Sequence, residues 1–266
     1  MNIYLTDYRT ASTTNIELLD DIVYPQYVHW FPDTIARAKS GMFYVPHRLA
    51  EKVLDQALLK ELRESKIGKT AFILASGNAH FAGINQRPYR ELDMITTDAS
   101  ACASSLKVLM DVQNLIRHYD FDRVIVLTVE DSITNTVLEF FGESKAVLTA
   151  QQENEGIKPS AFDNKNFGFR IGQGAALAVF ESERSIERLG VSPKAMRLRS
   201  YSASEASTNA IGQLEDGSGY VKAMHGAINQ AKIVQSDIGI VKSHGTGTVS
   251  NNNAEKNALT KNLTNF

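Results

Sequence analysis

Two short apolar segments constrain the fold of this chain more than any other feature. Residues 70–76 read Thr-Ala-Phe-Ile-Leu-Ala-Ser, and residues 124–129 read Val-Ile-Val-Leu-Thr-Val. A run of this kind, without polar alternation, is typical of a strand that is buried on both faces of a sheet. Between them, from Leu106 to Ile116, apolar residues recur at helical spacing. Strands that alternate with helices in this way predict an α/β fold with mostly parallel sheets covered by helices.

The rest of the chain continues this alternation. Further strands are predicted at residues 3–8, 93–100, 167–180, 196–203 and 238–243. Helices are predicted at residues 46–62, 102–118, 181–189, 216–231 and 251–263. We expect the segment 238–243 to be a buried strand, and we expect the apolar stripe of the helix at 216–231 to be buried as well.

Composition excludes several classes of function. The net charge is −2, with 28 basic and 30 acidic residues well mixed, which disfavours a nucleic-acid partner. No apolar run approaches the roughly 18 residues of a membrane span. The single cysteine rules out an internal disulfide, and the six scattered histidines disfavour a metal site. We therefore expect a cytoplasmic protein with a reduced thiol and no membrane span.

The cysteine lies where a predicted strand passes into a predicted helix. The segment at 98–106 reads Asp-Ala-Ser-Ala-Cys-Ala-Ser-Ser-Leu, so Cys102 stands at the start of the helix. The first turn of a helix has free N–H groups and a partial positive charge, which stabilise a thiolate. An inert core cysteine is the alternative, and at this position the two interpretations carry equal weight.

A second candidate, His244, follows the predicted strand at 238–243. It begins the segment His-Gly-Thr-Gly-Thr at 244–248, whose glycines allow a ligand to approach the backbone closely. Chemistry in parallel sheets gathers at the carboxyl ends of strands, so a thiol and an imidazole there suit a nucleophile and its partner. The hydroxyls of Thr246 and Thr248 can bind an amide-bearing or phosphate-bearing chain. A tight turn without a function remains the alternative for this segment.

Three segments, taken together and in order, resemble the β-ketoacyl synthases of the elongating type. The first is the segment at 98–106 that contains Cys102. The second combines Phe-Asp at 162–163 with Gly-Phe-Arg-Ile-Gly-Gln-Gly-Ala-Ala at 168–176. The third is Lys-Ser-His-Gly-Thr-Gly-Thr at 242–248, followed by Glu255. The resemblance covers most of the chain from Pro46 onward.

This resemblance implies the thiolase fold, a five-layered α/β/α/β/α sandwich of two similar halves. The chain is then one domain, with halves at about 1–160 and 161–266. The resemblance also implies a dimer around the strand at 93–100. The partner is either a second copy or another ketosynthase-like subunit.

The resemblance further implies a role for each candidate residue in fatty-acid or polyketide biosynthesis. Cys102 accepts an acyl group as a thioester from acyl carrier protein or coenzyme A, and its backbone N–H contributes to an oxyanion hole. His244 hydrogen-bonds the thioester carbonyl of a malonyl extender and helps its decarboxylation. The phosphopantetheine arm of the carrier passes near Thr246 and Thr248, and no cofactor is tightly bound.

The chain also departs from the family pattern. The family's second histidine, the lysine before it and a glycine-phenylalanine turn have no counterpart before Phe266, and Gln173 replaces a glutamate. We therefore expect a form that is shortened in the middle and at the C-terminus, with an incomplete second half: it is either naturally short or a piece of a longer protein. Two main hypotheses follow: an acyl-accepting ketosynthase-like enzyme, or a catalytically reduced partner subunit like a chain-length factor. A cysteine–histidine hydrolase is a third, if an asparagine at 251–253 orients the imidazole.

Overall fold

The chain folds into two compact units, which are described separately below. The first contains Met1–Asp20, Thr34–Ile133 and Gly172–Ser200, and the second contains Asp21–Asp33, Thr134–Ile171 and Tyr201–Phe266. The computed structural model describes residues 2–12, 17–18, 36–37, 68–77, 92–130, 135–163, 165–194, 198–207 and 212–262. The predicted helix at 46–62 lies outside these residues.

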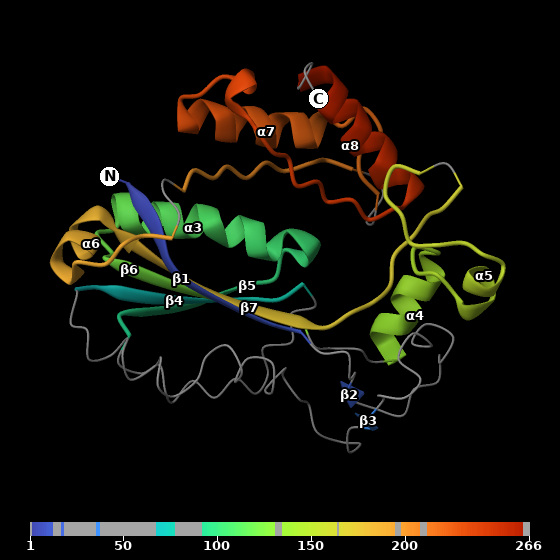
Figure 1. Ribbon diagram of the computed structural model, residues 1–266, viewed down its shortest axis with the longest axis horizontal. Coiled ribbons are helices and arrows are strands. Elements are labelled where there is room, and N and C mark those ends of the chain that lie inside the picture. The colour runs from blue at the N-terminus through green and yellow to red at the C-terminus, as the bar shows by residue number, and fades with distance from the viewer. Residues whose placement is uncertain are drawn as a thin grey trace. The chain divides into compact units, whose positions relative to one another are not determined.

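A five-stranded sheet forms the centre of the first unit (Figure 1). Its strands are β1 (Ile3–Ser12), β4 (Thr70–Ala75), β5 (Met94–Asp98), β6 (Arg123–Glu130) and β7 (Gly174–Ser182). Their order is β1-β7-β6-β4-β5. The strands β5, β4 and β6 pair in parallel, whereas β7 is antiparallel to both β6 and β1. The sheet is therefore mixed, and β5 is one of its edges. A separate parallel pair joins β2 (Glu17–Leu18) and β3 (Ala36–Arg37).

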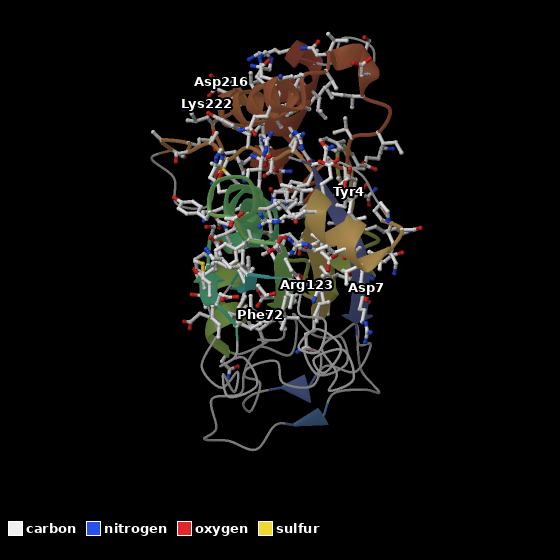
Figure 2. The ribbon with its side chains drawn as sticks, turned by 90° about the vertical axis from the view of Figure 1, so that its left-hand side faces the viewer. Tyr4, Asp7, Phe72, Arg123, Asp216 and Lys222 are labelled. Atoms are coloured by element: carbon white, nitrogen blue, oxygen red, sulfur yellow. The ribbon has the colours of Figure 1, made fainter. Side chains whose placement is uncertain are left out.

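The two apolar segments are buried on both faces of the sheet, as the sequence predicts. On one face they pack against α3 (Ser104–His118). The buried cluster on this face contains Ile3, Ala71, Ile73, Ala75, Val108, Val112, Leu115, Ile116, Phe121, Val124, Val126 and Phe180. Phe72 and Ile125, whose side chains alternate to the opposite face, are also buried, and Figure 2 labels Phe72 within the sheet. Each large apolar side chain buried in this way contributes roughly 1.5–3 kcal/mol.

An ion pair lies inside the same sheet. Arg123 on β6 and Glu181 on β7 are partners in the strand register, and Arg123 is labelled in Figure 2. The Arg123 Nε–H donates to Glu181 Oε1 over 2.7 Å, and both side chains are almost completely buried. Removing one partner of a buried pair leaves an uncompensated charge, so we regard this pair as a structural part of the sheet.

The helices of the first unit begin and end close to where the sequence places them. The expected helix at 102–118 starts with one 3-10 turn, Ala101–Ala103, and continues as α3. The expected helix at 181–189 is α6 (Glu183–Leu189), because β7 continues to Ser182. Ser182 caps α6 by accepting a hydrogen bond from the Ser185 N–H, and Gly190 ends it in the left-handed conformation.

The second unit consists of helices and extended segments. Its helices are α4 (Asn135–Glu143), α5 (Ala150–Asn154), α7 (Ser218–Ala231) and α8 (Val249–Asn262), with one 3-10 turn at Gln235–Asp237. The helices α7 and α8 pack together. They approach closely at Gly217, where an added Cβ would lie 2.3 Å from the Ala254 carbonyl oxygen. The described part of this unit has an isolated bridge between Val147 and Phe169 but no strand ladder.

Three predictions for the region after β7 are therefore corrected. The segment 238–243 is not a buried strand: it is an unpaired extended segment, and the Ile240 side chain is 88% exposed. The described residues of 196–203 form no strand either. The apolar stripe of α7 is only half-buried. Apolar sequence alone does not make a strand, because a strand also needs a neighbour whose N–H and C=O groups complete the ladder.

Candidate active site

Cys102 lies at a sharp turn between β5 and α3, which we call the elbow (residues 98–104). Its side chain is exposed. Ala101, the residue before it, has φ = 49°, a left-handed conformation that is uncommon for residues other than glycine. Such strain persists only when the surrounding structure holds it in place, and it is frequent at functional sites. The elbow thus has the strand–turn–helix geometry that displays a nucleophile.

The start of α3 and the ends of β4 and β6 stabilise the elbow. Ser104 is buried, and its hydroxyl donates to the Ala101 carbonyl oxygen over 2.7 Å. At the end of β4, the Gly77 N–H donates to Glu130 Oε2 over 2.9 Å, which joins the ends of β4 and β6. A Cβ on Gly77 would lie 3.3 Å from the Ala101 carbonyl oxygen, so these strand ends pack directly against the strained residue.

An ion pair joins the two sides of the elbow. The Asp98 carboxylate, at the end of β5, contacts the Lys107 ammonium in α3 and accepts a hydrogen bond from the Ser100 N–H over 3.0 Å. Burial disfavours ionisation of Asp98, but the hydrogen bonds from Lys107 and Ser100 outweigh it and hold the pKa of this carboxyl below its ordinary value. Lys107 also lies 3.7 Å from Asp111, one turn further along α3. Sequence reasoning missed this pair, for which the only signal is an acidic residue at the end of a strand.

His244 lies in a turn of the second unit, residues 243–248, which we call the histidine turn. Its side chain is exposed. Gly245 and Gly247 have φ values of 61° and 77°, so the glycines of this segment occupy the left-handed conformations that the turn requires. No strand precedes the turn. Its shape must therefore be held by other parts of the unit.

The histidine turn is held first by a buried carboxylate on α8. Glu255 accepts hydrogen bonds from the His244 N–H over 2.6 Å and from the Gly245 N–H over 2.7 Å. It also accepts one from the Asn251 side-chain amide over 2.8 Å. The motif at 242–255 contains Glu255 in the sequence, but its role in binding the backbone of the turn is visible only in the structure.

The turn is also held by the glycine-rich segment at 168–176. The Gly168 N–H donates to the Gly247 carbonyl oxygen over 2.9 Å. A Cβ on Gly247 would lie 2.5 Å from the Ser160 carbonyl oxygen, so only glycine fits there. Phe169, the next residue, packs edge-on against Phe141 of α4 at a ring distance of 5.6 Å. Two of the three recognised segments therefore meet in the second unit.

The two threonines of the turn are brought together. The hydroxyl groups of Thr246 and Thr248 are 2.9 Å apart and hydrogen-bond each other. One hydroxyl therefore donates to the other, and the Thr246 hydroxyl oxygen also accepts the Thr248 N–H over 3.4 Å. The proton of the second hydroxyl can still be donated to a ligand. Cys102 belongs to the first unit and His244, Thr246 and Thr248 to the second.

The Phe-Asp pair at 162–163 forms a tight loop before this segment. The Asp163 carboxylate accepts hydrogen bonds from the Lys165 N–H over 2.7 Å and from the Asn166 N–H over 3.1 Å. These bonds lower the pKa of Asp163 below its ordinary value. Asp163 thus shapes the loop that precedes Gly168.

The described residues contain neither a membrane-spanning helix nor a cluster of metal-ligating side chains. No helix there has the length and apolar character needed to cross a membrane. No group of three or more histidine, cysteine, aspartate and glutamate side chains is placed there to hold a metal ion.

Two family models match most of the chain from β5 onward. Residues 94–185 match "Beta-ketoacyl synthase, N-terminal domain", and residues 196–265 match "Beta-ketoacyl synthase, C-terminal domain". Together the two ranges cover more than half of the 266 residues. The elbow lies in the first range, and the histidine turn lies in the second.

Curated relatives agree with these matches. The chain is 27% identical over 150 residues to 3-oxoacyl-[acyl-carrier-protein] synthase 2 of Rhizobium meliloti, a match that covers 56% of this chain and 35% of that protein. It is 26% identical over 210 residues to the mitochondrial 3-oxoacyl-[acyl-carrier-protein] synthase of Arabidopsis thaliana, covering 79% and 44%. The chain thus spans less than half the length of these curated relatives.

Solved structures share the fold. One is a chain of a complex between a type II polyketide synthase acyl-carrier protein and its ketosynthase, bound to the hexaketide. It has a TM-score of 0.73 and 16% identity, over 99% of this chain and 78% of that chain. A β-ketoacyl synthase from Burkholderia phymatum has a TM-score of 0.66 and 19% identity, over 81% and 59%. The thiolase-like α/β fold is therefore confirmed. With these matches in the expected order along the chain, this protein belongs to the β-ketoacyl synthase family of the thiolase superfamily.

Proposed function

We propose that the chain is a ketosynthase-like acyltransferase that accepts an acyl group on Cys102. The observation that carries this proposal is the elbow, in which an exposed thiol follows a strained left-handed residue at the start of α3. Membership of the β-ketoacyl synthase family supports the same residue. In this family, fatty-acid and polyketide synthesis both proceed through acyl thioesters.

The proposed step is a thioester exchange. The Cys102 thiolate attacks the carbonyl carbon of the incoming acyl thioester, and the backbone N–H groups at the elbow stabilise the developing oxyanion. A new carbon–sulfur bond forms as the bond to the sulfur of the carrier's pantetheine breaks, and the released pantetheine sulfur takes up a proton. The acyl group is then held on Cys102 as a thioester. Because the reaction needs a free thiol, we assign it to the reducing cytoplasm.

In this proposal the histidine turn acts on the carrier-bound group. His244 donates a hydrogen bond to the thioester carbonyl of an extender unit, which favours loss of its carboxyl group and carbon–carbon condensation with the acyl chain on Cys102. The hydroxyls of Thr246 and Thr248 bind the phosphopantetheine arm of acyl carrier protein or coenzyme A. One solved relative was obtained with its acyl-carrier protein, which supports this class of partner.

We also propose that β5 forms a dimer contact. It is an edge strand of the sheet, and its Met94 and Ile95 side chains are 36% and 37% exposed. An exposed edge strand has unpaired N–H and C=O groups that can pair with a second chain. The partner is either a second copy or a ketosynthase-like subunit.

The test of the main proposal is direct acylation. The purified chain is incubated with acyl carrier protein that carries a labelled acyl group, and its intact mass is measured. We expect one acyl adduct, located on Cys102 by peptide mapping and absent from Cys102→Ala. His244→Ala is the matched control, because this proposal assigns His244 to the extender, so loading should persist. A folded chain that acquires no adduct contradicts the proposal.

A second candidate function is that of a catalytically reduced partner, like a chain-length factor. It is favoured by the described part of the second unit, which has no strand ladder. Size-exclusion chromatography with a full-length ketosynthase separates the two proposals. A stable heterodimer without an adduct on Cys102 favours the partner role, and an acylated homodimer excludes it.

A further inference from the structure

We propose that Asn251 is a positioning residue for the histidine turn. Its side-chain amide holds the Glu255 carboxylate against the backbone of His244 and Gly245, so that a neutral donor, and not a cation, sets the orientation of His244. This inference rests on the proposed function for the role of His244. The hydrogen bonds that it describes can be measured without any acyl transfer.

The first observation is the set of hydrogen bonds at Glu255. This carboxylate is 6% exposed and accepts three N–H groups, from His244, Gly245 and Asn251, over 2.6, 2.7 and 2.8 Å. Hydrogen bonds to a charged acceptor are shorter and stronger than neutral ones. The two backbone bonds fix the start of the turn, so any rotation of the Glu255 carboxylate would move His244.

The second observation is that both ends of the Asn251 amide are engaged. Asn251 is 1% exposed, its Nδ2 donates to Glu255, and its Oδ1 lies 2.7 Å from the Tyr220 hydroxyl of α7. A carboxylate can only accept, so the NH2 end of the amide must face Glu255 and the oxygen must face Tyr220. The Tyr220 O–H then donates to the amide oxygen, and the amide cannot flip without losing both bonds.

The third observation is the absence of a positive partner. Among the described residues, no lysine or arginine forms an ion pair with Glu255. Asn251 lies four residues before Glu255 on α8, a spacing that puts the two side chains on one helix face. The amide therefore supplies the buried donor that the carboxylate needs.

The test replaces the donor by a group whose donor capacity depends on pH. In Asn251→Asp, the new carboxyl lies beside the Glu255 carboxylate. Its titratable neighbours among the described residues are Tyr220 on α7 and Glu255 on α8. His244 contacts Glu255 through its backbone N–H and not through its imidazole. A neighbouring like charge makes one carboxyl of such a pair hold its proton to higher pH. At pH 5 the introduced carboxyl is protonated and donates to Glu255, and at pH 8 two carboxylates repel each other.

The measurement is amide hydrogen exchange at His244 and Gly245, corrected for the intrinsic rate at each pH. At pH 8 we expect about tenfold less protection in Asn251→Asp than in the unchanged protein, because the hydrogen bonds to Glu255 are lost. At pH 5 we expect protection within about twofold of the unchanged protein. Asn253→Asp, the same change at an exposed position of α8, is the matched control and should leave both amides unchanged.

Two results would overturn the proposal: unchanged protection in Asn251→Asp at both pH values, or an equal loss at both. If this variant does not fold, Tyr220→Phe tests the same idea. It removes the O–H that fixes the amide, and we expect about threefold less protection at His244 at every pH. Unchanged protection in Tyr220→Phe then contradicts the proposal. A missing acyl adduct on Cys102 would contradict only the proposed function.

Discussion

The elbow and the histidine turn solve the same structural problem in two ways. Each presents an exposed reactive side chain, Cys102 or His244, from a backbone that includes a left-handed residue. Each is held by a buried carboxylate. At the elbow this carboxylate is Asp98, which pairs with the Lys107 ammonium. At the turn it is Glu255, whose partners among the described residues are neutral N–H groups.

The two regions differ in where they carry strain. The left-handed residue at the elbow is Ala101, whereas the turn uses Gly245 and Gly247. An alanine in this conformation costs about 1–2 kcal/mol more than a glycine does. The elbow can bear this cost because the ends of β4 and β6 support it. The described residues of its unit form no strand ladder, and the turn depends on close backbone packing.

The substitution with the largest expected effect on stability disrupts that packing. Gly247→Ala would place a Cβ 2.5 Å from the Ser160 carbonyl oxygen and 2.6 Å from that of Gly168, at φ = 77°. Neither neighbour is a flexible side chain, so we expect the free energy of unfolding to fall by about 3 kcal/mol or more, measured by urea denaturation. Gly245→Ala is the control. Its Cβ would meet the Ser243 hydroxyl at 3.1 Å, and we expect a loss of about 1 kcal/mol. Equal losses in the two variants would show that packing does not hold the turn.

A smaller effect tests the ion pair at the elbow. Asp98→Asn removes the charge that Lys107 contacts. We expect the free energy of unfolding at pH 7 to fall by about 1–2 kcal/mol, a value limited by the partial exposure of Lys107. The pKa of Asp98 is lowered in the folded state, so its contribution is present above the ordinary aspartate pKa of about 3.9 and is lost as the pH falls through the folded value.

The difference in unfolding free energy between Asp98→Asn and the unchanged protein should therefore shrink as the pH is lowered from 7 to 3. Asp111→Asn, at the more exposed partner of Lys107, is the control, with an expected effect within about 0.5 kcal/mol. A difference that stays constant with pH would mean that the charge of Asp98 does not stabilise the elbow.

The smallest effect concerns the strain itself. Ala101→Gly relieves the strain of a left-handed alanine but gives the unfolded chain more conformational freedom. We expect the free energy of unfolding, measured by thermal unfolding, to rise by up to about 1 kcal/mol. Ala103→Gly, at φ = −88°, relieves nothing and should cost about 0.5–1 kcal/mol. A loss of stability in Ala101→Gly would show that the elbow is not strained.

Sequence alone determined those features that arise from short-range patterns. The apolar runs at 70–76 and 124–129 are strands buried on both faces, the helical spacing after Leu106 is α3, and Cys102 lies between a strand and a helix. The three motifs identified the family. Each of these signals lies within about fifteen residues of chain, where periodicity and local conformation decide the outcome.

Only the tertiary structure decided which groups hold the two reactive residues. The apolar segment 238–243 reads as a strand, yet within the part of the chain that the structure describes no segment forms a ladder with it. The Tyr220–Asn251 and Gly168–Gly247 hydrogen bonds join residues that are 31 and 79 positions apart. Local propensity carries no information about such partners, because a hydrogen bond between distant residues forms only when the packing of other elements brings its donor and acceptor together.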